Sequence, residues 1–480
     1  PRLEVSNGTV VAYSGPDGHT FYALSFAPNG EITLKPVVAF IRHLAPKYMY
    51  RVTTACGREA TITGDHNLWV LRDGQLTLVP TSEIRVGDYI PLPLQIPGPE
   101  CPLAHLDLLH LLEDSGLFVD ANVPVRAAIR QEGRPTITKA LGAFYRSPGS
   151  KLYAILNNKR NARFPIPVLR RFLNNTNGLY GCWDPTECQI FGKADRCALP
   201  LELPLTAELL RLMGFYLAEG NGQSDSGYFI WANRSPAMRD AFEHILSRLG
   251  IPFTVRPSSD YQVSSTALAR LLSGQMGATA SEKHLPPFWP QLDNEQLATL
   301  LRAYFDGDGW VERSSAVCCV TASRQLASDL AYALQRFGIW ARIRRVWKKA
   351  SNSPHQGAWY WQVTISGQDN LRAFHQHIGF SLDRKAQALE RQLQRSAHSN
   401  VDAIPGCGSR LKRLREGLGL SNKALARATG LSRAAILFFE QGKRNPLRAT
   451  LEKILDSLKE IAEQQKHRDT DWWQEWQYLR

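Results

Sequence analysis

The sequence predicts a multidomain protein with an all-β N-terminal domain, a central α+β domain of two repeats, and a small all-α module. Residues 1–93 alternate apolar and polar side chains between turn signals such as Asn7-Gly8, which is typical of short strands. From residue 204 a helical pattern occurs twice at similar spacing. After residue 405, Gly-Leu-Ser turns separate three short amphipathic segments, which predicts short helices. At 480 residues, the chain has room for about three domains.

Composition favours a polyanionic partner and gives no sign of a membrane span. The net charge is +13 and the pI is near 9.4. Residues 121–200 hold 13 Lys or Arg against 4 Asp or Glu, which favours phosphate contact over a merely solvated face. No apolar run reaches 18 residues, and "PRLEVSNGTV" lacks the pattern of a signal peptide. A soluble, intracellular protein is therefore expected, located in the cytoplasm and associated with the nucleoid.

The eight cysteines predict neither disulfides nor zinc. Cys182, Cys188 and Cys197 have no histidine nearby, and their spacing is poor for a zinc site. Cys318 and Cys319 lie in an apolar segment, which predicts buried thiols in a reducing compartment.

Changes in composition predict five segments. The Pro- and Gly-rich stretch "PLPLQIPGPECP" is typical of a linker, and "VDAIP" opens a second boundary. The basic region from 103 to 200 mixes short helices and loops without a recognisable fold. The predicted segments are a β domain at 1–98, a basic DNA-recognition insert at 99–200, the repeated domain at 201–396, a helical module at 401–467, and a Trp-rich tail at 468–480.

Both repeats begin with an apolar helical run that ends in an acid and a glycine. "LMGFYLAEG" ends in Glu219-Gly220, and "LRAYFDGDG" ends in Asp308-Gly309, 89 residues later. Each is followed by a strand-like segment and a second helix, and the acid lies 31 residues before Gly250 and 30 residues before Gly338. This agreement predicts two copies of one α-β-α unit.

Small residues predict that the two helices pack closely. Gly214 and Ala218 in the first copy align with Ala303 and Gly307 in the second, so each helix has two small residues on one face. Packing along these faces would place Glu219 beside Asp308. Two adjacent carboxylates repel unless a cation lies between them, and oxygen ligands suit Mg²⁺. An acid before a glycine is also a common helix stop, but its repetition in matched register favours a metal site.

These residues resemble the two signature helices of the LAGLIDADG homing endonucleases, in the single-chain form with two repeats. The resemblance covers residues 201–396 and implies two αββαββα halves whose sheets lie over double-stranded DNA. It further implies a monomer with internal pseudo-twofold symmetry that cuts both strands with Mg²⁺ or Mn²⁺. The residues implied at the metal are Glu219, Asp308, Gly220 and Gly309.

The resemblance also implies catalytic lysines and a basic DNA-contacting surface. "SEKHLPPFWP" matches one lysine to Lys283, and "GFSLDRKAQAL" matches a second to Lys385. Either would stabilise phosphate charge or position water; a solvated surface lysine is the alternative. Residues expected to contact DNA are Arg342, Arg344, Lys348, Arg433, Lys443, Arg444, Lys159 and Arg160.

The N-terminal domain resembles the Hint fold of inteins. Gly57, Thr63 and His66 match a splicing block, and "EIRVGDYIPLP" matches the strand that follows it. The resemblance implies that His66 protonates the scissile amide while Thr63 holds the peptide. Residue 1 is Pro and the chain ends in "WQYLR", so both terminal splicing chemistries are missing. The sequence therefore predicts a piece of an intein or a freestanding enzyme that kept part of a Hint domain, with the Trp-rich tail as a possible start of C-terminal Hint strands.

Residues 409–445 resemble repressor-type helix-turn-helix domains, with "NKALARATG" as the first helix, Gly430 in the turn, and "SRAAILFFEQGKRNP" as the recognition helix. Residues 401–467 carry 13 basic and 7 acidic residues, which favours phosphate contact. Phe438 and Phe439 are expected in the core. The leading prediction is a site-specific double-strand DNA endonuclease of the intein-encoded type. The alternatives are an intein with a decayed nuclease and a non-enzymatic DNA-binding regulator.

Overall fold

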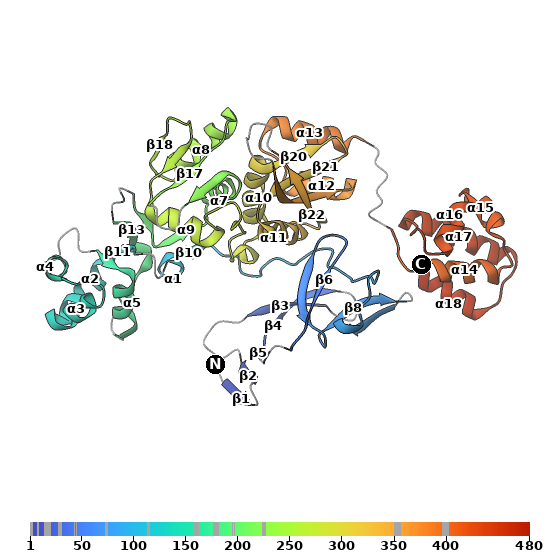
Figure 1. The fold of residues 1–480 in the computed structure, drawn as a ribbon, viewed down its shortest axis with the longest axis horizontal. Helices are drawn as coiled ribbons and strands as arrows, with labels where there is room; N and C mark the ends of the chain where they lie inside the picture. The colour runs from blue at the N-terminus through green and yellow to red at the C-terminus, as the bar shows by residue number, and fades with distance from the viewer. Residues whose placement is uncertain are drawn as a thin grey trace. The chain divides into compact units, whose positions relative to one another are not determined.

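The computed structural model describes residues 1–480 except 1, 2, 7, 8, 14–20, 27–30, 43, 45, 73, 74, 113–115, 158–162, 176–181, 194, 196, 223–226, 350–356 and 396–402. The chain divides into two compact units, one formed by residues 1–93 with 396–480 and the other by residues 94–395 (Figure 1). None of the helices in the described ranges is long and apolar enough to cross a membrane.

The N-terminal region consists of short antiparallel strands, as the alternating pattern predicts. Its elements are β1 (Leu3–Ser6), β2 (Thr9–Tyr13), β3 (Tyr22–Phe26), β4 (Ile32–Pro36), β5 (Ala39–Arg42), β6 (Met49–Thr53), β7 (Glu59–Thr63), β8 (Asn67–Arg72), β9 (Gln75–Pro80) and the 3-10 helix η1 (Thr81–Glu83). Strands β1, β2 and β5 form one sheet, and the other strands pair as the hairpins β3-β4, β6-β7 and β8-β9. The described strands therefore form several small sheets instead of one continuous sheet.

The basic region folds as short helices around a small antiparallel sheet. Its elements are β10 (His105–Asp107), α1 (Leu108–Leu111), β11 (Phe118–Asp120), α2 (Val123–Gln131), α3 (Gly133–Gly142), α4 (Gly149–Leu156), β12 (Phe164–Pro165), α5 (Ile166–Asn175), η2 (Pro185–Glu187), β13 (Gln189–Phe191), β14 (Leu199–Pro200) and β15 (Glu202–Pro204). Its buried residues, such as Leu117 and Ile129, belong to the same hydrophobic core as the repeats that follow. The sequence showed no period here because each of these elements is short.

The two repeats have the same element order, α-β-β-α-β-β-α. The first comprises α7 (Ala207–Glu219), β16 (Gly220–Gly222), β17 (Phe229–Trp231), α8 (Pro236–Arg248), β18 (Phe253–Val255), β19 (Tyr261–Val263) and α9 (Thr266–Met276). After η3 (Trp289–Gln291), the second comprises α10 (Asn294–Asp308), β20 (Gly309–Glu312), β21 (Ala316–Thr321), α11 (Arg324–Gln335), β22 (Ala341–Lys348), β23 (Ala358–Ser366), α12 (Gln368–His377) and the additional α13 (Asp383–Leu393). The sheets have matching strand orders, β16-β17-β19-β18 and β20-β21-β23-β22.

Local sequence sets where the first helix of each repeat begins and ends. The Thr206 side chain accepts a hydrogen bond from Leu209 N and caps α7, and Asp293 with Gln296 forms a capping box on α10. Both helices end at the predicted acid, and the next glycine enters a strand with extended backbone. The acid is therefore the last helical residue in both copies.

The C-terminal module is a bundle of α14 (Gly408–Gly417), α15 (Asn422–Thr429), α16 (Arg433–Glu440), α17 (Arg448–Gln464) and α18 (Thr470–Leu479). Gly430 ends α15 with φ of 63°, the left-handed conformation that glycine adopts without strain. The module has its own core, which includes Phe439. Phe438 is 42% exposed, so the expectation that both phenylalanines are buried was wrong for Phe438.

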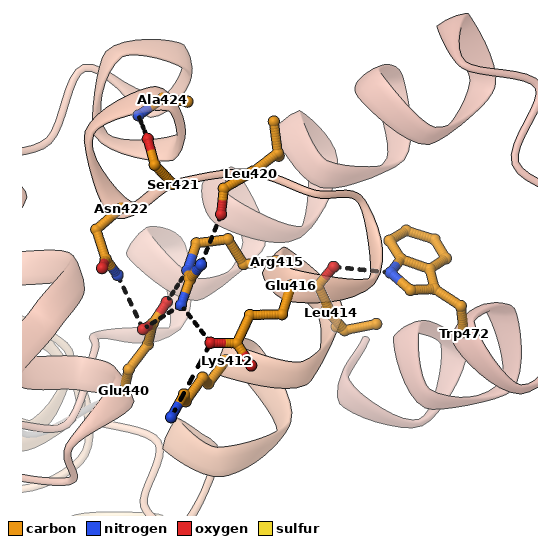
Figure 2. A network of polar contacts seen from close by, with 10 residues as sticks. All are labelled: Lys412, Leu414, Arg415, Glu416, Leu420, Ser421, Asn422, Ala424, Glu440 and Trp472. Carbon is orange, nitrogen blue, oxygen red and sulfur yellow. Dashed lines mark hydrogen bonds and ion pairs between the residues drawn. The ribbon is translucent and has the colours of Figure 1, made fainter.

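The Trp-rich tail is a helix of this module and does not form a strand. In α18, Trp472 is buried and donates to the Leu414 carbonyl at 2.8 Å, as Figure 2 shows. Trp476 donates to the Leu455 carbonyl at 2.8 Å. The tail thereby completes the core of the helical module.

Candidate active site between the two repeats

The first helices of the two repeats pack side by side through the predicted small residues (Figure 1). A Cβ atom added to Gly214 would lie 2.4 Å from the Leu300 carbonyl oxygen and 2.6 Å from Ala303 Cβ. A Cβ added to Gly307 would lie 2.5 Å from Ala218 Cβ. These distances leave no room for a larger side chain, so the small residues set the separation of α7 and α10.

The glycines after the two acids are required by close packing. A Cβ on Gly220 would approach the Tyr216 carbonyl oxygen to 2.6 Å, and one on Gly309 would approach the Phe305 carbonyl oxygen to 2.6 Å. The backbone torsions there are ones that any residue can adopt, with φ of −79° and −83°. The glycines thus let each strand start immediately beside the end of its helix.

Glu219 and Asp308 come together at the paired helix ends. A Cβ on Gly307 would lie 3.7 Å from Glu219 Cγ, so the Glu219 side chain lies against α10. Burial raises the pKa of Asp308 well above its ordinary value, and the negative charge of Glu219 raises it further. Burial likewise raises the pKa of Glu219, partly offset by its hydrogen bond with Asn233. The site holds two carboxylates whose charges repel each other.

Two hollows open beside these carboxylates. Glu219 lines the first, together with Asn233, Arg239 and Asp260. Asp308 lines the second with Asn233 among its neighbours. Asn233 Nδ2 donates to Glu219 Oε1 at 2.9 Å, so Asn233 orients the first acid and borders both hollows. Sequence reasoning missed Asn233, although it stands after the strand-like "GYFIWA" at a polar break in an apolar pattern.

Lys283 and Lys385 are buried and hold the two helix ends in the same way. Lys283 Nζ donates to the Tyr216 carbonyl at 3.1 Å and lies 3.2 Å from the centre of the Tyr216 ring. Lys385 Nζ donates to the carbonyls of residues 305–307, the nearest at 2.6 Å. Tyr216 and Phe305 both lie three residues before the acid of their helix. Each lysine therefore satisfies carbonyls that a helix end leaves unpaired, where a cation is favoured.

The environment of both lysines lowers their affinity for a proton. Burial lowers the pKa of Lys283 to about 6, against the opposing charge of Asp308. Burial also lowers the pKa of Lys385, while the charges of Asp306 and Asp308 act in the opposite direction. The alternative of a solvated surface lysine does not hold for either residue, because their exposed fractions are 3% and 9%.

A third buried acid, Asp306, was not singled out from the sequence. Its carboxylate accepts a hydrogen bond from Ser381 N at 2.9 Å, and burial raises its pKa. It lies two residues before Asp308 on α10. The positive charge of Lys385 partly offsets the rise in the pKa of Asp306. The signal that could have identified it is the "DGD" triplet, which has one acid more than the first copy.

Two segments of the chain match known protein families. Residues 295–379 match the LAGLIDADG-like domain family, and residues 411–462 match a helix-turn-helix family. The chain therefore carries a LAGLIDADG-like domain and a helix-turn-helix domain. The family match covers the second repeat, and the first repeat is related to it by the duplicated element order.

Several proteins with different names contain segments similar to this chain. It is 34% identical over 223 residues to a replication factor C small subunit of Thermococcus kodakarensis, covering 44% of the chain and 24% of that protein. It is 24% identical over 455 residues to RNA polymerase subunit Rpo1C of Methanocaldococcus jannaschii, covering 92% of this chain and 42% of that protein. It is 25% identical over 354 residues to the DNA polymerase II large subunit of Haloquadratum walsbyi, covering 66% of this chain and 15% of that protein. The chain thus spans less than half the length of each of these relatives.

Solved structures also align with parts of this chain. Full-length DUF199/WhiA from Thermatoga maritima aligns over 55% of this chain and 93% of that chain, with 16% identity and a TM-score of 0.28. A variant of the homing endonuclease I-DmoI aligns over 39% and 98%, with 12% identity and a TM-score of 0.28.

The carboxylates at the ends of α7 and α10 fit a hard divalent cation. Glu219 and Asp308 offer carboxylate oxygens from two facing helices, and a cation would relieve their repulsion. The described part of the chain contains no cluster of three or more His, Cys, Asp or Glu arranged to hold a metal ion. Two protein carboxylates with the remaining positions left to water and phosphate oxygens is a pattern that Mg²⁺ accepts.

One face of the second LAGLIDADG sheet carries the predicted arginines. In β22, Ala341 and Ile343 are buried while Arg342 and Arg344 are exposed, so the two arginines point away from the core. Lys348 lies an even number of residues further along β22, so it is on the same side of the strand as Arg342 and Arg344. Its Nζ lies 5.4 Å from the centre of the ring of Trp310, the residue after Gly309. The sheet therefore has a basic face that extends to the end of α10 at which Asp308 lies.

The remaining predicted residues lie outside the LAGLIDADG helices. Thr63 ends β7 and accepts a hydrogen bond from His66 N at 3.3 Å, so both belong to one turn, in which His66 is exposed. In the helix-turn-helix domain, Arg433, Lys443 and Arg444 are exposed at the start of α16 and just after its end. Lys159 and Arg160 lie outside the described residues.

Proposed function

We propose that this protein is a site-specific endonuclease that hydrolyses both strands of duplex DNA with Mg²⁺ or Mn²⁺. The observation that carries the proposal is the meeting of Glu219 and Asp308 at the ends of two closely packed helices. A lone acid before glycine is an ordinary helix end. The Glu219 charge raises the pKa of Asp308, so the two ionised carboxylates are unfavourable together in the absence of a cation. Two such acids at matched positions of two repeats favour a metal-binding role.

Each part of the proposed site has a separate task. Glu219 and Asp308 would hold the cation, with backbone oxygens of Gly220 and Gly309 beside them. The bound cation would polarise the phosphate, lower the pKa of bound water and stabilise the leaving oxygen. Asn233 keeps the Glu219 carboxylate oriented through its hydrogen bond. Lys283 and Lys385 fix the helix ends from which the acids project, and act as positioning residues.

The proposed DNA contacts come from two separate surfaces, the basic sheet face and the helix-turn-helix domain. Arg342, Arg344 and Lys348 supply long donors on one face of the sheet, suited to phosphates and base edges. The helix-turn-helix domain adds Arg433, Lys443 and Arg444. The insert at 99–200 would extend the contact, since it has the strongest local excess of basic residues.

The distribution of relatives supports an origin within an intein. A replication factor C small subunit, an RNA polymerase subunit and a DNA polymerase subunit have different names, yet each contains a segment similar to this chain. A segment carried between unrelated proteins is what a homing element would produce. Thr63 and His66 would then be the remaining splicing-type residues. The competing proposals are an intein whose nuclease has decayed and a DNA-binding regulator that does not cut.

Cleavage of DNA tests the proposal directly. The full chain is incubated with a plasmid library of candidate insertion sites, in Mg²⁺ or in EDTA, and double-strand ends are sequenced. Wild type is expected to cut at one class of site in Mg²⁺ only. Glu219→Gln and Asp308→Asn should each lower the cleavage rate at least about 100-fold while DNA binding persists, since each removes a metal ligand.

The matched control is Asp369→Asn, because the Asp369 side chain on α12 is fully exposed and lines neither hollow. It should cut at close to the wild-type rate. A wild-type protein that binds DNA tightly and never cuts it would favour the regulator or the decayed nuclease. Cleavage that survives both Glu219→Gln and Asp308→Asn would show that these acids do not hold the metal.

A further inference from the structure

The recognition helix α16 exposes an apolar surface. Ile436 and Phe439 are buried in the module, whereas Leu437 is 37% exposed and Phe438 is 42% exposed. Ala434 is exposed as well, three and four residues before them, so the three side chains lie on one outward face. Leaving such side chains in water forgoes the free energy of their burial, and grouped apolar side chains on a surface mark a contact site.

This outward orientation is fixed by a buried ion pair. Figure 2 shows Arg415 of α14 bound to Glu440 at the end of α16, with distances of 2.6 and 3.0 Å. Asn422 of α15 donates to the same carboxylate at 2.8 Å. Arg415 and Glu440 have exposed side-chain fractions of only 7% and 5%. Since three helices are joined at this carboxylate and Phe439 fills the core, α16 cannot rotate to bury Phe438.

Unpaired cations surround the apolar face. The exposed basic residues on α15, on α16 and just after α16 are Lys423, Arg427, Arg433, Lys443 and Arg444. None of them has an ion-pair partner among the residues that the structure describes. On the α14 and α18 side, by contrast, Arg410 and Arg413 pair with Glu475. The positive charge left unpaired is therefore concentrated around the exposed face of α16, which suits a polyanion.

We propose that Phe438 and Leu437 read thymine methyl groups in the major groove of the bound DNA. The thymine 5-methyl is the apolar group that the major groove presents, and alanine and phenylalanine side chains are suited to contact it. The surrounding cations would bind phosphates on both sides of the groove. This inference rests on the proposed function for the presence of DNA and adds the base that the module selects.

Replacing thymine by deoxyuridine tests the inference, because deoxyuridine pairs with adenine in the same way and lacks only the 5-methyl group. Duplexes are first selected from a random library by the full chain in EDTA, which prevents cleavage. Affinity is then measured by fluorescence anisotropy for the selected duplex and for copies with deoxyuridine at each thymine. Wild type should lose about four-fold in affinity at each contacted methyl group.

Variants on the helical module identify the residue responsible. Phe438→Ala should lose the preference at the thymine that Phe438 contacts and keep it at the thymine that Leu437 contacts. Phe438→Leu should keep part of the preference at the first of these positions. Tyr478→Ala is the control, because Tyr478 is an aromatic residue of α18 that is 47% exposed. It should discriminate as wild type does. Circular dichroism checks that each variant is folded.

Several outcomes would overturn the inference. One is a wild-type protein that binds the thymine and deoxyuridine duplexes equally, and another is a Phe438→Ala variant that keeps the wild-type preference at every thymine. If Phe438→Ala instead abolishes self-association in sedimentation while leaving the preference intact, the face is a protein interface. The proposed function can fail independently of this inference. A protein that prefers thymine methyl groups but never cuts DNA in Mg²⁺ would contradict only the nuclease proposal.

Discussion

The residue that best reports the state of the proposed metal site is Asp308. Burial and the Glu219 charge both raise its pKa, so its ionised form is disfavoured in the folded protein. A carboxyl group with a raised pKa in the folded state stabilises the fold at low pH and loses that contribution as pH rises. A bound cation would pair with ionised Asp308 and so remove the free-energy cost of ionising it in the folded protein.

Removing the Asp308 charge should therefore stabilise the metal-free protein at neutral pH. In EDTA, the melting temperature of Asp308→Asn minus that of wild type should grow between pH 5 and pH 7.5, reaching about 2 °C or more. Because the Asp308 charge also raises the pKa of Lys283, the difference reports Asp308 together with its coupling to Lys283. Adding Mg²⁺ should raise the melting temperature of wild type only. A difference that shrinks as pH rises would contradict the assigned electrostatics.

At the scale of elements, the helix pair α7 and α10 depends on close backbone approach. Gly214 faces the Leu300 carbonyl, so a methyl group there has no space to enter without separating the helices. Gly274 in α9 is also a helix glycine, but a Cβ added to it meets nothing within 4 Å. The two glycines share a helical setting and differ in their surroundings.

Alanine at these two positions should change stability in opposite directions. Gly214→Ala is expected to destabilise the protein by about 1–3 kcal/mol because the interface is overpacked. Gly274→Ala is expected to stabilise it by up to about 1 kcal/mol, since alanine favours the helix. Denaturant unfolding measures both. If Gly214→Ala is as stable as Gly274→Ala, close packing does not hold the helix pair together.

At the scale of the whole molecule, the repeats and the C-terminal module have separate hydrophobic cores. The first core includes residues of the basic insert and of both repeats, and the second includes residues of α14 to α18 only. Trp472 belongs to the second core, where its ring is buried and its indole N–H is satisfied by Leu414. Damage to one core should leave the other intact.

Trp472→Ala should loosen the helical module alone. Loss of a buried tryptophan costs about 3–5 kcal/mol, so amide hydrogen exchange should speed up across residues 408–479. Exchange in α7 and α10 should stay unchanged. Trp347→Ala provides the control, since Trp347 is 52% exposed. Faster exchange in α7 or α10 would show that the two cores are coupled.

The sequence alone determined the repeat, its helices and the residues that bring them together. Helix periodicity, terminal acids and paired small residues are local signals. Because they occur twice in matched positions, they identify Gly214 and Gly307 as contact residues of the two helices. The same holds for the helix-turn-helix segment, where Gly430 marks the turn. The fold of the basic insert was not predictable, because its short strands pair across long stretches of chain, as β11 does with β13.

Only the tertiary structure decided how the side chains at the site are used. Lys283 and Lys385 match a family pattern in sequence, but their contacts with helix carbonyls follow from distant segments meeting at the helix ends. Asn233 acquires its role in the same way, and Phe438 is exposed because a buried ion pair orients α16. Local sequence sets what each segment can form, whereas burial and electrostatic environment depend on which segments the fold brings together.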